Sequence, residues 1–142
     1  MIRVFVDGSC RRNGTKDARA GIGVVAYKVE AHTSTLMFKF GRLVTYETNN
    51  MAEYSAVFHA LRELKNYGQE EIVVHSDSQL IVNQLLGTWE LKDRRLVQLY
   101  SMIMQLITMV PFTNLNFKWI PRTENKEADE IAQSITDEKR DA

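Results

Sequence analysis

The first third of the chain shows the residue spacing of β-strands. Short apolar runs at 2–6, 20–27 and 36–44 are rich in β-branched and aromatic residues, and each ends at polar or glycine-containing sequence. The stretch 10–19 between the first two runs carries many charged residues. We therefore expect three strands, the first two joined by a loop that is longer than a tight hairpin turn.

A helical period replaces the strand pattern near residue 50. Glu53, Val57 and Leu61 recur every four residues, on one face of the expected helix. Asn50 stands three residues before Glu53, a spacing that favours a cap at the helix N-terminus, and Gly68 ends the helix. The carboxylate of Glu53 therefore lies on an otherwise apolar stripe, where burial opposes its charge.

The second half of the chain alternates the two patterns. Its periodicity predicts a strand at 71–76, a helix at 78–86, a longer helix at 96–110, a strand at 115–119 and a last helix capped by Asn125. This order predicts an α/β domain in which helices pack on the faces of a mixed sheet. We expect the domain to cover 1–136 and a charged, frayed tail to follow at 137–142.

Composition narrows the class of protein. A chain of 142 residues, 44% hydrophobic and 25% charged, fits one domain, and its short apolar runs predict a soluble, cytoplasmic protein with no membrane segment. The single cysteine, Cys10, excludes an internal disulfide. The net charge of zero means that any affinity for nucleic acid must come from local basic patches. A monomer is the expected state.

Four carboxylates occupy positions that suggest shared chemistry. Asp7 and Asp77 each follow a short apolar strand, and Asp129 stands in the first turn of the last helix. Each acid alone, like Glu53, could serve a turn or a helix N-terminus. Gathered at one place, the four would repel one another without a cation, and oxygen ligands favour Mg²⁺ or Mn²⁺. The three histidines show no spacing typical of a zinc site.

Four segments that contain these acids resemble a known family. They are 4–9 (VFVDGS), 48–54 (TNNMAEY), 75–79 (HSDSQ) and 119–129 (WIPRTENKEAD). In their order and spacing they resemble the four signature segments of type 1 ribonuclease H. Each segment alone is a weak signal, whereas all four together cover nearly the whole chain.

The resemblance implies a fold, an activity and a metal site. The fold would be the ribonuclease H-like fold, an α/β structure with a five-stranded mixed sheet flanked by helices. The protein would be an endonuclease that cuts the RNA strand of RNA/DNA hybrids and leaves 5′-phosphate and 3′-hydroxyl ends. Asp7, Glu53, Asp77 and Asp129 would hold two Mg²⁺ or Mn²⁺ ions, one activating a water and one stabilising the leaving 3′ oxygen.

The resemblance also implies residues that contact the substrate. The positions that match groove contacts, where the protein senses the 2′-hydroxyl groups of RNA, are Gly8, Asn13, Asn50 and Gln79. Thr48 matches a position that contacts a phosphate.

Three segments depart from the family pattern. The segment 87–96 is too short to form the basic protrusion of the longer members, which favours the short, archaeal-type subgroup, with Lys92 as a contact to the substrate backbone. The family's well-studied bacterial members carry a histidine shortly before the last aspartate, and none stands in the loop before Asp129 here; Arg122 occupies this shortened loop, where it could stabilise the charged transition state or the product phosphate. The loop 12–17 replaces the usual Gly-Asn-Pro-Gly, so groove contacts there differ.

Alternative functions remain open at this point. The same sequence could encode a weakly active or inactive hybrid-binding module of this fold, or a nuclease of the same superfold that cuts DNA or structured RNA. A small α/β domain that only binds a protein partner is the third alternative. That alternative leaves the four acids unexplained.

Overall fold

The computed structural model describes residues 1–137, so the predicted tail from 138 onward lies outside the described residues. The strands are β1 (Ile2–Arg11), β2 (Arg19–Glu30), β3 (Thr33–Val44), β4 (Glu71–Ser76) and β5 (Asn114–Trp119). The α-helices are α1 (Asn49–Glu63), α2 (Gln79–Leu85), α3 (Arg94–Met109) and α4 (Lys126–Thr136), with short 3-10 helices η1 (Lys65–Tyr67) and η2 (Arg122–Glu124).

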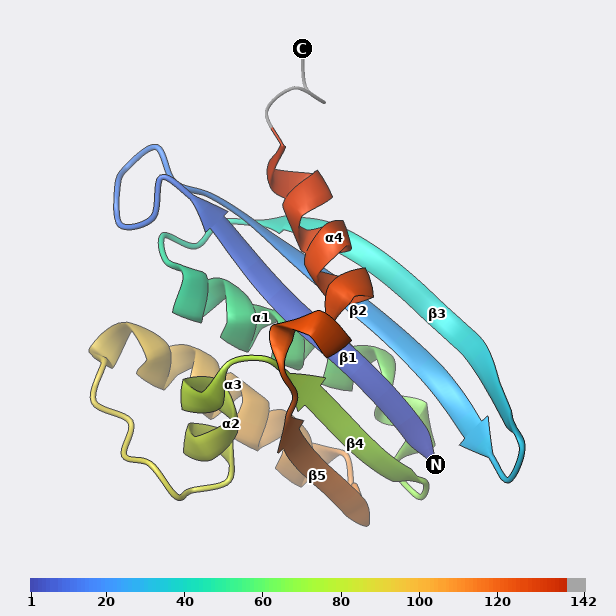
Figure 1. The fold of residues 1–142 in the computed structure, drawn as a ribbon. Helices are drawn as coiled ribbons and strands as arrows, with labels where there is room; N and C mark the ends of the chain where they lie inside the picture. Colours follow the sequence, from blue (N-terminus) through green and yellow to red (C-terminus); the bar gives the residue numbers. More distant parts are fainter. Residues whose placement is uncertain (138–142) are drawn as a thin grey trace.

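The five strands form one mixed sheet in the order β3-β2-β1-β4-β5. β1 and β3 run antiparallel to β2, whereas β4 runs parallel to both β1 and β5. Figure 1 shows the long β1–β3 part of the sheet beside the shorter β4 and β5. The predicted five-stranded mixed sheet with flanking helices is therefore confirmed.

The first strand is longer than its apolar run. β1 continues to Arg11 because β2 pairs with it along its whole length, including Asp7 opposite Gly23. Asp7 therefore lies inside a strand, which corrects the prediction that it follows one, and the loop to β2 shrinks to 12–18. The parallel pairing with β4 ends earlier, at Phe5 and His75. Asp7 thus stands just past the point where β1 and β4 separate.

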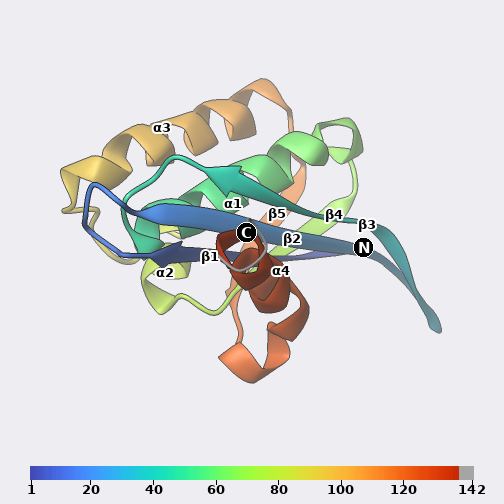
Figure 2. The same ribbon diagram turned by 90° about the horizontal axis from the view of Figure 1, so that it is seen from above.

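The two faces of the sheet are covered by different helices. Figure 2 shows α1 and α3 on one face and α4 on the other. The main core lies on the α1 face, where side chains of β1, β2 and β4 meet Leu61 of α1, Ile81 of α2 and Ile103 of α3, all fully buried. Burial of these apolar side chains is the main favourable contribution to folding.

Helix α4 packs against β1, β2 and β3 on the opposite face. The approach is close at Gly23, where an added Cβ would stand 2.2 Å from the carbonyl oxygen of Ala128. Only glycine permits this contact between helix backbone and strand, which brings the first turn of α4 toward the middle of β1.

Helix α1 begins two residues earlier than the spacing predicted. Thr48, rather than Asn50, is its N-cap, and the Thr48 hydroxyl accepts a hydrogen bond from the backbone N–H of Met51 at 3.2 Å. A threonine at this position satisfies one of the free N–H groups of the first turn, and Asn50 is already helical. No helix within residues 1–137 has the length and apolar character needed to cross a membrane.

Candidate active site

Three carboxylates from three separate elements meet in one pocket. Asp7 comes from β1, Glu53 from the second turn of α1, and Asp77 from the residue after β4. A carboxylate oxygen from each lies within 4.8 Å of the other two. They meet just past the point where the pairing of β1 with β4 ends. The predicted convergence of acids at this sheet position therefore exists for these three residues.

Close packing of α1 on β1 places Glu53 beside Asp7. A Cβ added at Gly8 would stand 2.4 Å from the backbone nitrogen of Glu53 and 2.4 Å from the carbonyl carbon of Ala52. Any side chain at residue 8 would therefore push α1 away from the strand. Gly8, predicted as a groove contact, has this structural requirement as well.

Burial keeps these carboxyl groups from ionising easily. Asp7 is 6% exposed, and burial raises its pKa to about 9, helped by the charge of Asp77, a hydrogen bond with Asp129 and the charge of Glu53. Burial, followed by the charge of Asp77, raises the pKa of Glu53 to about 8, against a hydrogen bond from Ser78 and the charge of Arg122.

A bound divalent cation would reverse this effect. Within the part of the chain that the structure describes, the three acids form the one cluster of potential ligands that could share an ion, and all their donor atoms are oxygens. Hard cations such as Mg²⁺ and Mn²⁺ prefer carboxylate oxygen, and their charge stabilises the ionised form of each group. The donor set and the mutual repulsion therefore fit a divalent metal.

Asp129 lies at the same pocket but outside the tight group of three. It lines the cavity of about 370 Å³ together with the other three acids, and its carboxylate accepts a hydrogen bond from Gln133 at 3.1 Å. The guanidinium of Arg122 lies 3.5 Å from the Asp129 carboxylate, and the Arg122 side chain is 72% exposed. Arg122 thus contributes positive charge at the rim of an acidic pocket.

Asn125 is a site residue that the sequence pattern did not reveal. Its position predicted a helix cap, yet its side chain makes no capping hydrogen bond. The amide nitrogen donates instead to the carbonyl of Val6 at 2.9 Å and to the Asp77 carboxylate at 3.2 Å. Burial raises the pKa of Asp77, and the hydrogen bond from Asn125 partly opposes this rise. Asn125 therefore connects α4, β1 and Asp77, and only its long-range contacts could show this.

Trp119 also holds the site together. Its side chain is 41% exposed, at the last residue of β5, which pairs with Ser76 next to Asp77. Its indole N–H donates to the backbone carbonyl of Asp77 at 3.1 Å, and the backbone N–H of Ile120 donates to the backbone carbonyl of Ser76 at 2.9 Å. These bonds anchor the end of β4, and hence the backbone of Asp77, to β5.

The predicted substrate contacts lie in three places. Gly8 and Asn50 line the acidic pocket. The Asn13 side-chain oxygen accepts from the backbone N–H of Asn49 at 2.8 Å, which ties the β1–β2 loop to the start of α1. The remaining three, Thr48, Gln79 and Lys92, lie outside the pocket lining.

Each of those three residues has a different environment. Thr48 is 9% exposed, and its hydroxyl oxygen is used as the α1 cap. Gln79 is the exposed first residue of α2, next to the pocket residue Ser78. Lys92 is exposed in the segment between α2 and α3, which contains no helix of its own. The absence of a protruding helix in that segment agrees with the short subgroup.

Comparison with known protein families supports the reading of these motifs. Residues 5–135 match a family described as reverse transcriptase-like. The matched range includes all four acids, Asn125, β1 from Phe5 onward and the whole of the other four strands.

Two solved structures are similar over nearly the whole chain. The crystal structure of LC11-RNase H1, isolated from compost by a metagenomic approach and bound to an RNA/DNA hybrid, matches with a TM-score of 0.84 and 32% identity, covering 99% of both chains. The structure of RNase H1 from the halophilic archaeon Halobacterium salinarum matches with a TM-score of 0.82 and 28% identity, covering 99% of this chain and 98% of that one.

Curated relatives are longer than this chain. The bifunctional protein Rv2228c of Mycobacterium tuberculosis is 33% identical over 134 residues, which cover 94% of this chain and 35% of that protein. Ribonuclease HI of Halobacterium salinarum is 28% identical over 137 residues, which cover 96% of this chain and 65% of that protein. The chain thus spans between about one third and two thirds of the length of these relatives.

Proposed function

Since this chain belongs to the reverse transcriptase-like family and resembles the type 1 ribonuclease H enzymes within it, we propose that it hydrolyses the RNA strand of RNA/DNA hybrids. The observation that carries the proposal is the convergence of Asp7, Glu53 and Asp77 within 4.8 Å. The hybrid bound by LC11-RNase H1, whose whole chain is matched, supports the same substrate class. All four acids come from one chain, which suits the predicted monomer.

In this proposal the carboxylates are the metal ligands, and the bound metal supplies the chemistry of hydrolysis. Asp7, Glu53 and Asp77 would bind Mg²⁺ or Mn²⁺, and Asp129 would complete the ligands of a second ion. Two such ions would supply the charge that activates a water and stabilises the leaving 3′ oxygen, giving 5′-phosphate and 3′-hydroxyl ends. Asn125 keeps the Asp77 carboxylate oriented through its amide N–H group.

Arg122 would act on the phosphate rather than on the metal. Its guanidinium stands at the exposed rim of the pocket, where it could meet a negatively charged phosphate as the substrate arrives. Guanidinium groups suit phosphate because they offer several N–H donors in one plane. Arg122 would thus stabilise charge in the transition state or on the product.

Selectivity for hybrids would come from residues around the pocket. Gly8 and Asn50 line it directly, and Asn13 and Gln79 flank it, so their backbone and amide groups could sense the 2′-hydroxyl groups of an RNA strand. Thr48 and Lys92 would contact the substrate backbone, Lys92 from the exposed segment between α2 and α3.

The experiment that tests the proposal is a cleavage assay with matched substrates. A labelled RNA/DNA hybrid is compared with single-stranded RNA, duplex RNA and duplex DNA, each with Mg²⁺, Mn²⁺ or a chelator. We expect metal-dependent cutting of the RNA strand of the hybrid alone, with 5′-phosphate ends. Cleavage of duplex DNA or duplex RNA would replace the proposal with another nuclease of this fold.

The absence of any cleavage would have a different meaning from cleavage of another substrate. If the protein bound the hybrid but cut no substrate with either metal, the chain would be the inactive hybrid-binding module. Direct binding measurements on the same hybrid distinguish this result from a protein that does not recognise hybrids at all.

A further inference from the structure

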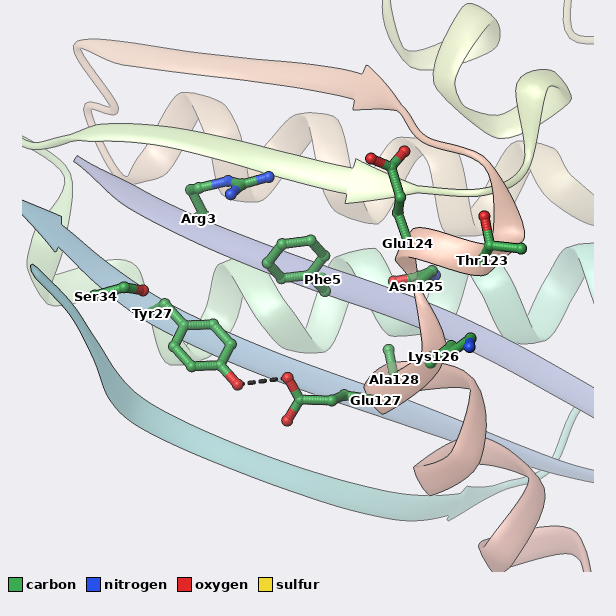
Figure 3. Close-up of a pocket in the computed structure, with 10 residues that line it drawn as sticks. All are labelled: Arg3, Phe5, Tyr27, Ser34, Thr123, Glu124, Asn125, Lys126, Glu127 and Ala128. Carbon is green, nitrogen blue, oxygen red and sulfur yellow. Dashed lines mark hydrogen bonds between the residues drawn. The ribbon is translucent and has the colours of Figure 1, made fainter.

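A second cavity lies on the α4 face of the sheet, separated from the acidic pocket by η2 and the start of α4. Its volume is about 300 Å³, and its lining includes Arg3, Phe5, Tyr27, Ser34, Asn125 and Glu127. Figure 3 shows these side chains around an opening between β1, β2 and the first turn of α4. The four acids of the candidate active site do not line this cavity.

The floor of the cavity is aromatic and positively charged at one end. The Phe5 ring stacks on His75 with centroids 4.7 Å apart, and the Arg3 guanidinium lies 5.1 Å from the Phe5 centroid. Arg3 donates its Nε hydrogen to His75 at 3.2 Å, and within residues 1–137 no carboxylate pairs with Arg3. Its terminal N–H groups are therefore available to an oxygen acceptor in the cavity.

The opposite wall supplies acceptors. The Tyr27 hydroxyl donates to the Glu127 carboxylate at 2.5 Å, as Figure 3 shows. The charged residues that line the cavity are Arg3, Lys126, Glu124 and Glu127, two positive and two negative. This balance favours a neutral ligand over a phosphate or a cation.

Asn125 provides an unused acceptor at the end of the cavity. Its side chain is 1% exposed, and its amide oxygen has no hydrogen-bond partner. Because the amide nitrogen faces Val6 and Asp77, the oxygen points the other way, toward Phe5 (Figure 3). A buried acceptor without a partner is costly, so an N–H group on a ligand would be favourable here.

We propose that this cavity binds a neutral, planar heteroaromatic group with N–H donors and oxygen acceptors, the chemistry of a nucleobase. Such a ring would stack against Phe5, donate an N–H to the Asn125 oxygen and accept from Arg3. The base could come from a free nucleoside or from an unpaired nucleotide of a strand. Both sources carry the same recognition groups.

A matched pair of small molecules tests the recognition of Asn125. Theophylline and caffeine share a purine ring with two carbonyl groups, and they differ by one N–H that is methylated in caffeine. Each is titrated into metal-free protein, together with uridine and inosine, while ¹H–¹⁵N NMR follows Phe5, Ser34, Glu127 and the side-chain amide of Asn125. We expect theophylline and the nucleosides to shift these signals, with caffeine at least about tenfold weaker.

A pair of variants tests the contribution of Arg3 to binding. Arg3→Met removes the guanidinium but keeps an apolar chain, and it should weaken theophylline binding by about tenfold or more. Arg62→Met makes the same change on an exposed residue of α1, across the sheet, and should leave binding unchanged. A thermal melt of each variant establishes that it is folded.

Different results of these experiments would support or overturn the proposed nucleobase site. Equal binding of caffeine and theophylline, an equal loss in both arginine variants, or no shift at these residues would overturn the proposal. Binding of a short single-stranded RNA at these residues without binding of nucleosides would support the cavity and assign the base to a strand. None of these measurements depends on cleavage, so a failure here is distinct from a failure of the proposed nuclease function.

Discussion

The two faces of the sheet are built for different purposes. On the α1 face, β1 contributes Ile2, Val4 and Val6 to the main hydrophobic core. On the α4 face, the alternate residues of the same strand are Arg3, Phe5 and Asp7, and the side chains near them include charged and polar groups. The side chains of β1 thus alternate between the hydrophobic core and polar surroundings, and Glu53 reaches the acidic pocket from the N-terminal part of α1, at the edge of that core.

This division explains how buried acids are tolerated. The apolar face supplies stability, because fully buried side chains such as Leu61 and Ile103 favour the folded state. That stability can offset the cost of holding Asp7 and Glu53 near one another out of water. Variants on the two faces should therefore have opposite effects on stability and activity.

The largest expected effect is on the chemical face. Asp7→Asn should lower hybrid cleavage by about 10³-fold or more, because a metal contributes several kcal/mol of transition-state stabilisation. The same variant should melt at a higher temperature without metal, since it removes a buried carboxyl group whose ionisation is opposed first by burial and then by the charge of Asp77. Single-turnover cleavage and thermal melting measure both effects.

Asp17→Asn is the matched control for that variant. Asp17 is exposed in the β1–β2 loop, so its change should alter neither rate nor melting temperature. Full activity of Asp7→Asn with Mg²⁺ would remove Asp7 from the proposed site.

The pH dependence of stability is the next test of the same face. The folded-state pKa values of Asp7 and Glu53, about 9 and about 8, lie above the ordinary values of 3.8 and 4.5. The folded protein therefore keeps protons that the unfolded chain has lost, so stability is full below about pH 4 and falls as the pH rises toward 9. Urea unfolding with a chelator across this range measures the slope.

Divalent metal and a variant serve as internal checks on that slope. Added Mg²⁺ should restore stability near pH 8, and Asp7→Asn should flatten the metal-free profile. A profile that is unchanged by the variant would mean that Asp7 ionises normally in the folded protein.

On the apolar face, Leu61→Ala should destabilise the protein by about 2–5 kcal/mol because it leaves a cavity in the core. Chemical denaturation measures this loss. The exposed apolar residue Val97 of α3 is the control, since Val97→Ala should change stability by no more than about 0.5 kcal/mol. The cleavage rate of the folded Leu61→Ala protein should remain near that of the parent, and a large rate loss would contradict the division of the two faces.

A smaller effect is expected where the helix α4 meets Asp77. Asn125→Ala removes the amide that orients the Asp77 carboxylate, and it should lower metal affinity or cleavage by about 10–100-fold. Cleavage rate as a function of Mg²⁺ concentration measures this change. Asn66→Ala, an exposed change in η1, is the control, and equal kinetics in the two variants would leave Asn125 with a structural role only.

Arg122→Ala should have the smallest effect. The exposed guanidinium interacts through water-screened contacts, so its loss should slow cleavage by about three- to tenfold. Melting temperature should stay the same, because the change is on the surface. Steady-state kinetics measure the rate, and an unchanged rate would assign Arg122 no part in the reaction.

Local spacing along the chain predicted most of the fold. Alternation of side chains and helical periodicity depend on the backbone geometry of neighbouring residues, so they revealed all five strands and the four α-helices. The errors lie at the ends of helices and strands, where the boundary depends on contacts with residues far away in the sequence. β1 extends past Val6 because β2 pairs with it, and α1 is capped by Thr48 through a bond that spacing alone does not reveal.

The amino-acid sequence by itself determined the elements, the family resemblance and the identity of the four acids, because these follow from residue types and their order. The tertiary structure alone decided which of those acids share one position, since Asp7, Glu53 and Asp77 are brought within 4.8 Å by packing between distant segments. It also decided the role of Asn125, whose partners Val6 and Asp77 are 119 and 48 residues away in the chain. Contacts over such separations depend on how β1, β4 and α4 pack together, and no local pattern records that packing.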